Sequence, residues 1–486
     1  MNRRHFIMTS GAAALVACSS PRRGMGRTGF ALAQDIESAA GRALALGVAP
    51  GISVAVYTRE GVYAQGFGVA DVVTGERATA DTVFYIASST KSMTSLALAI
   101  REARGELDLD ATVAEFAPEA PFPPAVRANE TRLRHLLSHT GGIANEPIEF
   151  RFTETGQHDP DTLWRLLAAS EPNSDAPLGR FSYANVGYNI TTILTDRRLG
   201  VAWQDLLNLE IFGPSGMNRT SARMSRARGE QWSIAKPHRI GPSGARERSY
   251  LEKTDQTMHS AGGVVMSAND ALRWLELVVE DGRIGGRQII PAEVVRGTRA
   301  PIATVNVDFE GYRRDAYGLG WYIGPYRNER MLSHFGGFNG FRAHISYLPD
   351  RHIGVAAFVN DSSAALIPVN AIANYVYDRL GGHTDADPRF EDAIAAAATR
   401  RAEGARRILA ERAGRAGVRW TLIRPRSAYV GAYENAHWGR IEITIEDEAL
   451  VVACGVLRSP AWPSAESDAL WVELEPGAGT DITFEG

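Results

Sequence analysis

The hydrophobic and polar positions of this chain follow two periods, which predict two kinds of element. Apolar residues at helical spacing predict helices over residues 35–49, 90–104 and 366–380. Period-two alternation and short apolar runs predict strands over residues 52–57, 62–69, 318–323, 331–335, 341–348 and 353–359. Between about 106 and 280, short helical patterns alternate with loops rich in proline and glycine, without a convincing run of strands.

The order of these elements predicts the domain organisation. Strands lie at both ends of residues 35–385 and helices lie between them, which indicates an α/β (α+β) layer arrangement with one sheet built from both ends. Residues 386–423 are rich in alanine, arginine and glutamate, and they predict a solvated helical linker. Over residues 424–486 the period changes to two, which predicts a small all-β domain with strands at 440–446, 450–454 and 470–474.

Composition narrows the class of protein. The 486 residues are 44% hydrophobic and 22% charged and include two cysteines, which excludes a disordered, collagen-like or disulfide-scaffold protein. No apolar run approaches the roughly 18 residues of a membrane span, which excludes a polytopic membrane protein. The net charge of −4 gives no electrostatic reason to expect nucleic acid as a partner.

Lysine is rare in this chain. Of 52 basic residues only Lys91, Lys236 and Lys253 are lysines, and we attribute the bias to the composition of the genome. Where arginine fills nearly every cationic position, a retained lysine is a candidate for chemistry that arginine cannot perform.

The first residues predict an export signal. Residues 1–18 begin with Arg3 and Arg4, continue with a short apolar stretch, and resemble a twin-arginine signal peptide. Cys18 ends a segment that resembles the lipoprotein cleavage box, so we favour lipidation of Cys18 and a periplasmic protein anchored to the membrane by that lipid. The alternative is cleavage after Ala33, at the end of a linker over residues 19–34. Lipidation would leave Cys454 as a lone thiol.

Ser88 and Lys91 form the first candidate for chemistry. They stand three residues apart where a predicted strand enters a helix, so both side chains face the same way. The helix N-terminus favours the serine alkoxide, and a buried lysine with a lowered pKa can accept or relay its proton. Ser233 and Lys236 have the same spacing but lie in a loop with no helix after it.

Two further segments have both a chemical and a purely structural interpretation. Tyr183 and Asn185 stand in a loop before a predicted helix, where they could also be a packing aromatic residue and a helix cap. His334 and Gly337 end a predicted strand, where they could also be a strand histidine and part of a glycine-rich hairpin.

Together and in this order, the three segments resemble the serine β-lactamase and penicillin-binding-protein superfamily, in particular its class C β-lactamase-like branch. The segments Phe84–Ser92 and Leu136–Ile143 match it in style, and the resemblance covers residues 35–385. It implies an antiparallel sheet flanked by helices with a helical subdomain. The module over residues 424–486 resembles a small β-barrel-like domain that follows this fold in some peptidases and shapes access to the site.

The resemblance also implies roles for the site residues. Ser88 matches the acylated nucleophile, Lys91 the lysine that helps to deprotonate it, and Tyr183 the tyrosine that shuttles the proton to the leaving group. Asn185 would donate a hydrogen bond to a substrate carbonyl. His334 occupies the position of a cationic residue on the strand beside the site. The backbone N–H groups of Ser88 and Gly337 would form the oxyanion hole.

The resemblance implies no cofactor and no metal. His135 and His139 have the i, i+4 spacing of a metal pair, but no third ligand is evident and a structural turn is the favoured interpretation. No Glu-x-x-x-Asn segment of the class A kind can be placed near the site, so Tyr183 is the favoured base, with Lys91 as its cationic neighbour.

His334 sets the predicted substrate class. True β-lactamases of this branch carry lysine at this position, whereas histidine is charged only below about pH 6.5. We therefore expect an exported serine hydrolase that forms an acyl-enzyme on Ser88 and cleaves an amide or ester bond in a D-amino-acid peptide or small ester. The alternatives are β-lactamase or DD-carboxypeptidase-like activity, or a non-catalytic relative that binds penicillin or peptide.

Overall fold

A computed structural model describes residues 30–484 of the chain. The predicted signal peptide, residues 1–18, lies outside the described residues. An eight-stranded antiparallel sheet has the order β12-β13-β14-β15-β16-β17-β1-β2. The strands are β1 (Gly51–Tyr57), β2 (Val62–Gly68), β12 (Ala303–Phe309), β13 (Tyr312–Tyr317), β14 (Tyr322–Tyr326), β15 (Glu329–Phe338), β16 (Phe341–Leu348) and β17 (Ile353–Val359). The N-terminal hairpin joins the later strands through β1 and β17, as the sequence predicts.

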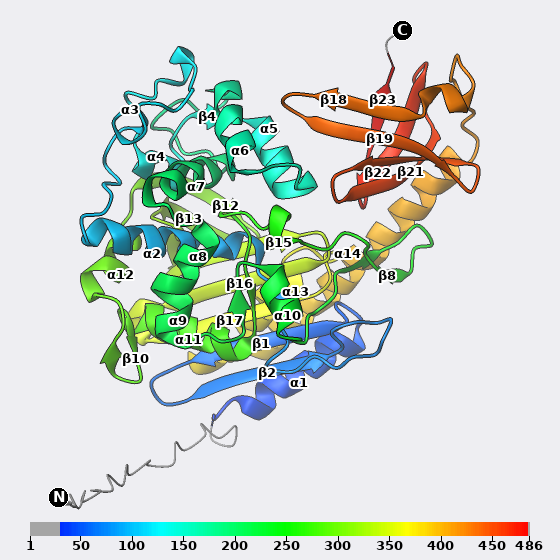
Figure 1. Cartoon of the computed structure of the whole chain (residues 1–486). Helices are drawn as coiled ribbons and strands as arrows, with labels where there is room; N and C mark the ends of the chain where they lie inside the picture. The colour runs from blue at the N-terminus through cyan, green and yellow to red at the C-terminus, as the bar shows by residue number, and fades with distance from the viewer. Residues whose placement is uncertain (1–29, 485–486) are drawn as a thin grey trace, which may run out of the picture.

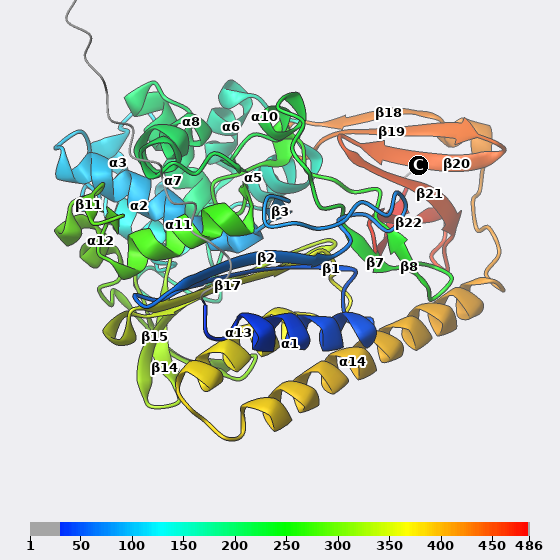
Figure 2. The same ribbon diagram turned by 90° about the horizontal axis from the view of Figure 1, so that it is seen from below.

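Helices cover both faces of this sheet (Figure 2). α1 (Ala33–Ala45), α13 (Ile367–Leu380) and α14 (Ala386–Arg415) lie on one face, and α2 (Thr90–Ala103) and α11 (Ala268–Val279) lie on the other. Successive side chains of β1 point to opposite faces, so Val54 packs in one hydrophobic core and Ala55 in the other. This two-sided burial explains why β1 and β17 are buried along their whole length.

The middle of the chain forms a layer of helices on the same face of the sheet as α2 (Figures 1 and 2). Its helices are α3 (Val113–Phe116), α4 (Leu133–Leu137), α5 (Glu146–Glu149), η3 (Phe150–Thr155), α6 (Pro160–Leu166), α7 (Val186–Leu199), α8 (Trp203–Leu207), α9 (Gly213–Ser215), α10 (Met224–Gly229) and α12 (Ala292–Thr298). Short strands join these segments: β3 (Phe84–Tyr85), β4 (Ile143–Ala144), β5 (Glu171–Pro172), β6 (Thr220–Ser221), β7 (His238–Ile240), β8 (Arg246–Arg248), β9 (Val265–Met266), β10 (Arg283–Ile284) and β11 (Arg287–Gln288).

Two expectations about the later strands are wrong. Residues 318–321 form a turn instead of a strand, because Gly320 adopts φ +80° and a Cβ atom there would lie 2.4 Å from Ser92 Cα. The turn thereby packs directly on the start of α2. The expectation that the late strands begin at residue 318 is also wrong, because β12 and β13 precede it. β12 alternates apolar and polar residues, but most of its residues are exposed. The first helix also ends at Ala45, four residues earlier than predicted.

The C-terminal residues form a second sheet whose strands follow chain order. They are β18 (Gly431–Asn435), β19 (Gly439–Glu446), β20 (Ala449–Cys454), β21 (Leu457–Pro463), β22 (Ala469–Glu475) and β23 (Ala478–Thr483). Ile443, Val452 and Leu470 belong to a small core of their own. The long helix α14 leads from the first sheet to this one (Figure 2).

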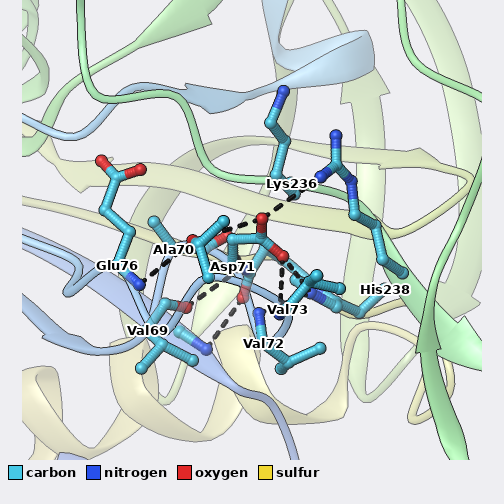
Figure 3. Close-up of polar contacts among 12 residues, drawn as sticks. Val69, Ala70, Asp71, Val72, Val73, Glu76, Lys236 and His238 are labelled. Atoms are coloured by element: carbon cyan, nitrogen blue, oxygen red, sulfur yellow. Dashed lines mark hydrogen bonds and ion pairs between the residues drawn. The ribbon is translucent and has the colours of Figure 1, made fainter.

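Buried polar groups hold the segment after residue 233 against the loop that follows β2 (Figure 3). The Asp71 carboxylate accepts hydrogen bonds from the Val73 N–H at 2.9 Å and from Arg248 at 3.2 Å. His238 Nε2 accepts the Val72 N–H at 3.2 Å. Lys236 donates its backbone N–H to Ala70 and pairs through Nζ with a glutamate at 2.9 Å. Lys236 therefore forms a structural ion pair at this junction. It does not stand beside a serine at the start of a helix as Lys91 does.

Candidate active site

Ser88 lies in η1 (Ala87–Ser89), a single turn that runs directly into α2. Ala87 has φ +46°, a left-handed conformation that is uncommon and strained for a residue with a Cβ atom. The Ser89 hydroxyl donates to the His334 carbonyl at 2.9 Å, which ties this turn to β15. The fold therefore holds Ser88, which is only partly buried, at a helix start beside the strand that carries His334 and Gly337.

Lys91 is fully buried and points its ammonium group at three oxygen atoms. Nζ lies 3.3 Å from Ser88 Oγ, 2.7 Å from Asn185 Oδ1 and 2.8 Å from the Ala261 carbonyl oxygen. Burial holds the pKa of Lys91 well below its usual range, and the Glu149 carboxylate opposes that shift. The lysine is thus connected to the serine and predisposed to give up its proton.

Tyr183 closes the site from the opposite side. Its ring centre lies 4.8 Å from Lys91 Nζ, and its hydroxyl group interacts with Ser88. The residue keeps 40% of its surface exposed, yet burial raises the pKa of Tyr183 well above its usual range. Burial of the phenolate therefore opposes the cationic effect that a role of Tyr183 as base would need.

Asn185 stands immediately before α7. Its Oδ1 atom accepts the Lys91 ammonium, which leaves its Nδ2 amide free to donate to another group. The Glu149 carboxylate accepts the Val186 N–H at 2.9 Å and also the Asn185 N–H, so it caps the helix that positions Asn185. Burial raises the pKa of Glu149. The sequence reasoning missed Glu149, because it precedes α7 by 37 positions and belongs to none of the three segments.

His334 is buried on β15 and faces an aromatic wall. Its ring lies 6.0 Å from Tyr183 and 5.6 Å from Tyr322. Nδ1 donates to the Phe335 carbonyl at 2.9 Å, which assigns the proton to Nδ1 and leaves Nε2 as a buried acceptor without a partner. Burial, together with Lys91, holds the pKa of His334 well below its usual range. The histidine is therefore neutral near pH 7 and does not provide a cation.

The glycines after His334 let β15 approach the nucleophile. A Cβ atom on Gly336 would lie 2.0 Å from the Ile86 carbonyl oxygen, so this position admits no side chain. A Cβ atom on Gly337 would meet its nearest neighbour at 3.5 Å, an ordinary contact. Gly337 is exposed, so its backbone is accessible to a ligand that lies along β15.

Arg314 is a second residue that sequence reasoning missed. It lies on β13, is 6% exposed, and its guanidinium group is 3.7 Å from the centre of the Tyr322 ring. Over residues 30–484 it has no carboxylate partner, and its buried Nε atom has no hydrogen bond. Its positive charge acts to lower the pKa of both Tyr183 and His334. A cation without a counter-ion therefore stands beside the site.

His135 and His139 do not meet at a metal site. His135 Nδ1 accepts the Arg132 N–H, whereas His139 packs against Tyr183 with ring centres 4.4 Å apart. Within the described part of the chain, one group of three side chains has the spacing of a metal site, namely Glu102, Asp108 and Asp110. Arg134 already pairs with Glu102 and Asp110.

The C-terminal sheet contacts the rim of the site with the turns of its hairpins. Gln157, just after η3, exchanges two hydrogen bonds with the backbone of Arg440, and the Val456 N–H donates to the Thr155 carbonyl. Lys253 lies buried at this junction, where it donates to the Thr153 carbonyl at 2.8 Å and where burial lowers its pKa to about 8. This sheet therefore supports η3, the helix that follows Glu149.

Comparisons with known proteins agree on the family and the fold. The sequence model of the family described as Beta-lactamase matches residues 37–372. Penicillin-binding protein 4* of Bacillus subtilis (strain 168) is 25% identical over 439 residues, which cover 86% of this chain and 88% of that protein. Unguisins hydrolase ungD of Aspergillus violaceofuscus (strain CBS 115571) is 24% identical over 350 residues, 68% of this chain and 61% of that protein, so the chain spans less than two thirds of this relative.

A solved structure shows the same fold. The D-amino acid amidase from Ochrobactrum anthropi SV3, complexed with L-phenylalanine, matches with a TM-score of 0.59 and 19% identity, over 72% of this chain and 99% of that one. None of the described helices has both the length and the apolar character needed to cross a bilayer.

Proposed function

Because this chain belongs to the β-lactamase family, which is a family of serine hydrolases, we propose that it is an exported hydrolase that forms an acyl-enzyme on Ser88. The observation that carries the proposal is the contact between Lys91 Nζ and Ser88 Oγ at 3.3 Å, made by a lysine that burial predisposes to lose its proton. A lysine in this state can accept the serine proton and so generate the nucleophile.

The geometry supports a two-step acyl transfer. Lys91, as the free amine, receives the Ser88 proton either directly or through the Tyr183 hydroxyl, while Oγ bonds to the substrate carbonyl carbon. The N–H groups of Ser88 and Gly337 stabilise the resulting oxyanion. Tyr183 then passes the proton to the departing amine or alcohol, and a water molecule releases the acyl group by the same route. Because its pKa is raised, Tyr183 acts as a neutral relay, and Lys91 acts as the base.

For the substrate we propose an amide or ester of a D-amino-acid peptide, or a small ester. A neutral His334 supports this class, because it offers a hydrogen-bond acceptor in place of the permanent cation that β-lactamases of the class C branch carry there. The D-amino acid amidase with the same fold is consistent with it. One observation favours the second candidate, a β-lactamase or DD-carboxypeptidase: Arg314 supplies an unpaired cation close to His334 that could hold a substrate carboxylate.

Labelling of the nucleophile tests the mechanism. A fluorophosphonate probe and a labelled penicillin are each added to the wild-type protein and to Ser88→Ala. We expect Ser88 to be labelled and Ser88→Ala, which loses only one hydroxyl, to stay folded and unlabelled. If neither reagent labels folded wild-type protein, the chain is a non-catalytic relative and the proposal fails.

We also expect activity to fall at low pH, where Lys91 is protonated, and a flat profile of activity down to about pH 5 would refute the proton relay.

A hydrolysis panel tests the substrate class. It contains nitrocefin, short-chain p-nitrophenyl esters, D-Ala-D-Ala peptides and D-aminoacyl anilides. Arg314→Met provides the discriminating variant. If hydrolysis of nitrocefin or D-Ala-D-Ala peptides dominates and falls with Arg314→Met while ester hydrolysis remains, the carboxylate-binding candidate replaces the preferred one. If D-aminoacyl anilides or esters dominate in both proteins, the preferred class stands.

We further propose a periplasmic location with a lipid anchor on Cys18. The support is the sequence of residues 1–18 alone, which lie outside the described structure. Radiolabelled palmitate incorporation in an expressing bacterium, compared between wild-type protein and Cys18→Ser, tests the anchor. Loss of label in the variant supports it. A mature protein that begins after Ala33 and carries no label would establish the alternative cleavage.

A further inference from the structure

A cavity of about 410 Å³ lies between η3, α6, α7 and α8. These helices lie together in the helical layer above the sheet (Figure 1). The volume is within the range of small-molecule sites in proteins. Asp196, on the last turns of α7, lines the cavity 11 residues after Asn185, so about 16 Å of helix separates it from the catalytic site.

The walls of this cavity are mostly apolar. Phe152, Leu163, Ile193 and Trp203 are buried and line it, and Trp164 contributes a further aromatic ring. Such a lining favours an aromatic or branched aliphatic body, because burying it removes apolar surface from water. No side chain of the described residues fills the space.

Asp196 is the one carboxylate in this lining. Its Oδ1 atom is buried without a hydrogen-bond partner, and over residues 30–484 the side chain has no ion-pair partner. The cations at the mouth are committed elsewhere: Arg223 pairs with Asp205 at 2.8 Å, and Arg197 stacks on the Trp164 ring at 4.3 Å. A buried acceptor without a donor is costly, so this position is built for a group that donates hydrogen bonds.

We propose that this cavity binds a small primary amine, with its ammonium group on Asp196 and its apolar body between the aromatic walls. An ammonium ion supplies both the missing hydrogen-bond donors and the missing counter-ion, whereas an alcohol supplies only a donor. An anionic ligand would place two negative charges together. The site goes beyond the proposed hydrolysis at Ser88, because no residue of that reaction lines it.

The protonation of Asp196 should make the affinity for an amine depend on pH. Burial and the Asp205 charge raise its pKa to about 8, while Arg223 and the Trp203 N–H oppose the shift. The empty site is therefore mostly neutral at pH 7, and an ammonium ion must displace the proton to gain its full attraction. His158, also in the lining, has a lowered pKa and stays neutral over this range, and the cationic side chains of the lining are Arg197 and Arg223. Affinity for an amine should consequently rise as the pH increases from 6 to about 8.5.

The test is calorimetric titration at about pH 8.5, where Asp196 is mostly ionised, with phenethylamine, with 2-phenylethanol as the neutral analogue and 3-phenylpropanoate as the anionic one. We expect the amine to bind at least about tenfold more tightly than either analogue. Asp196→Asn should remove that preference, whereas Asp161→Asn, which changes an exposed carboxylate of α6 outside the lining, should keep it. Equal binding of amine and alcohol, full binding to Asp196→Asn, or no binding of the amine at millimolar concentration would overturn the proposal.

A second variant keeps the test decisive if Asp196→Asn does not fold. Val201→Phe places a larger side chain in the cavity and leaves Asp196 in place, so it should abolish amine binding without removing the charge. Protein whose Ser88 has first been blocked by the fluorophosphonate should bind the amine as tightly as untreated protein, which separates this site from the catalytic one. Competition between the two ligands would instead place the amine at Ser88 and refute the second site.

Discussion

Glu149 offers a sharp test of how the site is held, because its two contributions can be separated. Its carboxylate caps α7 by accepting the Val186 and Asn185 N–H groups, and its negative charge acts on Lys91. Glu149→Ala removes both contributions. Glu149→Gln keeps an oxygen acceptor for the cap and removes only the charge. Glu146→Gln, an exposed neighbour on α5, serves as the control.

The two variants should differ in stability. Glu149→Ala leaves two backbone donors at the start of α7 without an acceptor, so we expect a loss of about 2 kcal/mol in the free energy of unfolding. Because burial raises the pKa of Glu149, the ionised side chain carries a net cost in the folded protein at neutral pH. Glu149→Gln relieves that cost, and we expect a change within about 1 kcal/mol. Urea denaturation at pH 7 measures both.

The charge effect should appear in the reactivity of Ser88. Glu149 favours the ammonium form of Lys91, so its removal lowers the pKa of Lys91 further and the free amine persists to lower pH. We expect the acid limb of fluorophosphonate labelling to move to lower pH in Glu149→Gln than in the wild-type protein. An unchanged acid limb, or equal stability of the Ala and Gln variants, would refute this account of Glu149.

Three other outcomes follow from the geometry. Lys91→Arg should abolish labelling of Ser88, since a guanidinium does not give up its proton, and mass spectrometry of the treated protein would detect any remaining adduct. Gly336→Ala should reduce both the labelling of Ser88 and the thermal stability, because its Cβ would lie 2.0 Å from the Ile86 carbonyl oxygen. In the control Gly337→Ala the nearest atom would lie at 3.5 Å, so this variant should unfold within a few degrees of wild type. Equal melting temperatures of the two variants would contradict this account. Burial raises the pKa of Cys454 to about 11, so its thiol should react with Ellman's reagent at pH 8 only after unfolding.

The sequence predicts the parts of the site that are local in the chain. Ser88 and Lys91 lie one helical turn apart, and Tyr183 and Asn185 share one loop, so spacing alone brings each pair together. The union of the two ends in one sheet could also be predicted, because β1 and β17 are continuous apolar runs that need cover on both faces.

The remainder depends on contacts between distant segments. Glu149 reaches the site only because α5 packs against the start of α7, and Arg314 reaches it on β13, a strand that the hydrophobic pattern did not reveal. The direction of a pKa also depends on tertiary burial. Burial raises the pKa of Tyr183 and lowers the pKa of His334, and the residue types alone do not determine either shift.

The pairing of the first strand has a consequence for how the protein matures. Gly51 donates its N–H to the side chain of Asn360 at 2.8 Å, across 309 positions of the chain. The β1–β2 hairpin therefore lacks β17, its neighbour in the sheet, until nearly the whole catalytic domain has left the ribosome, and contacts of such long range slow folding. Such a delay would be compatible with the twin-arginine export proposed from residues 1–18, because that pathway carries proteins that have already folded.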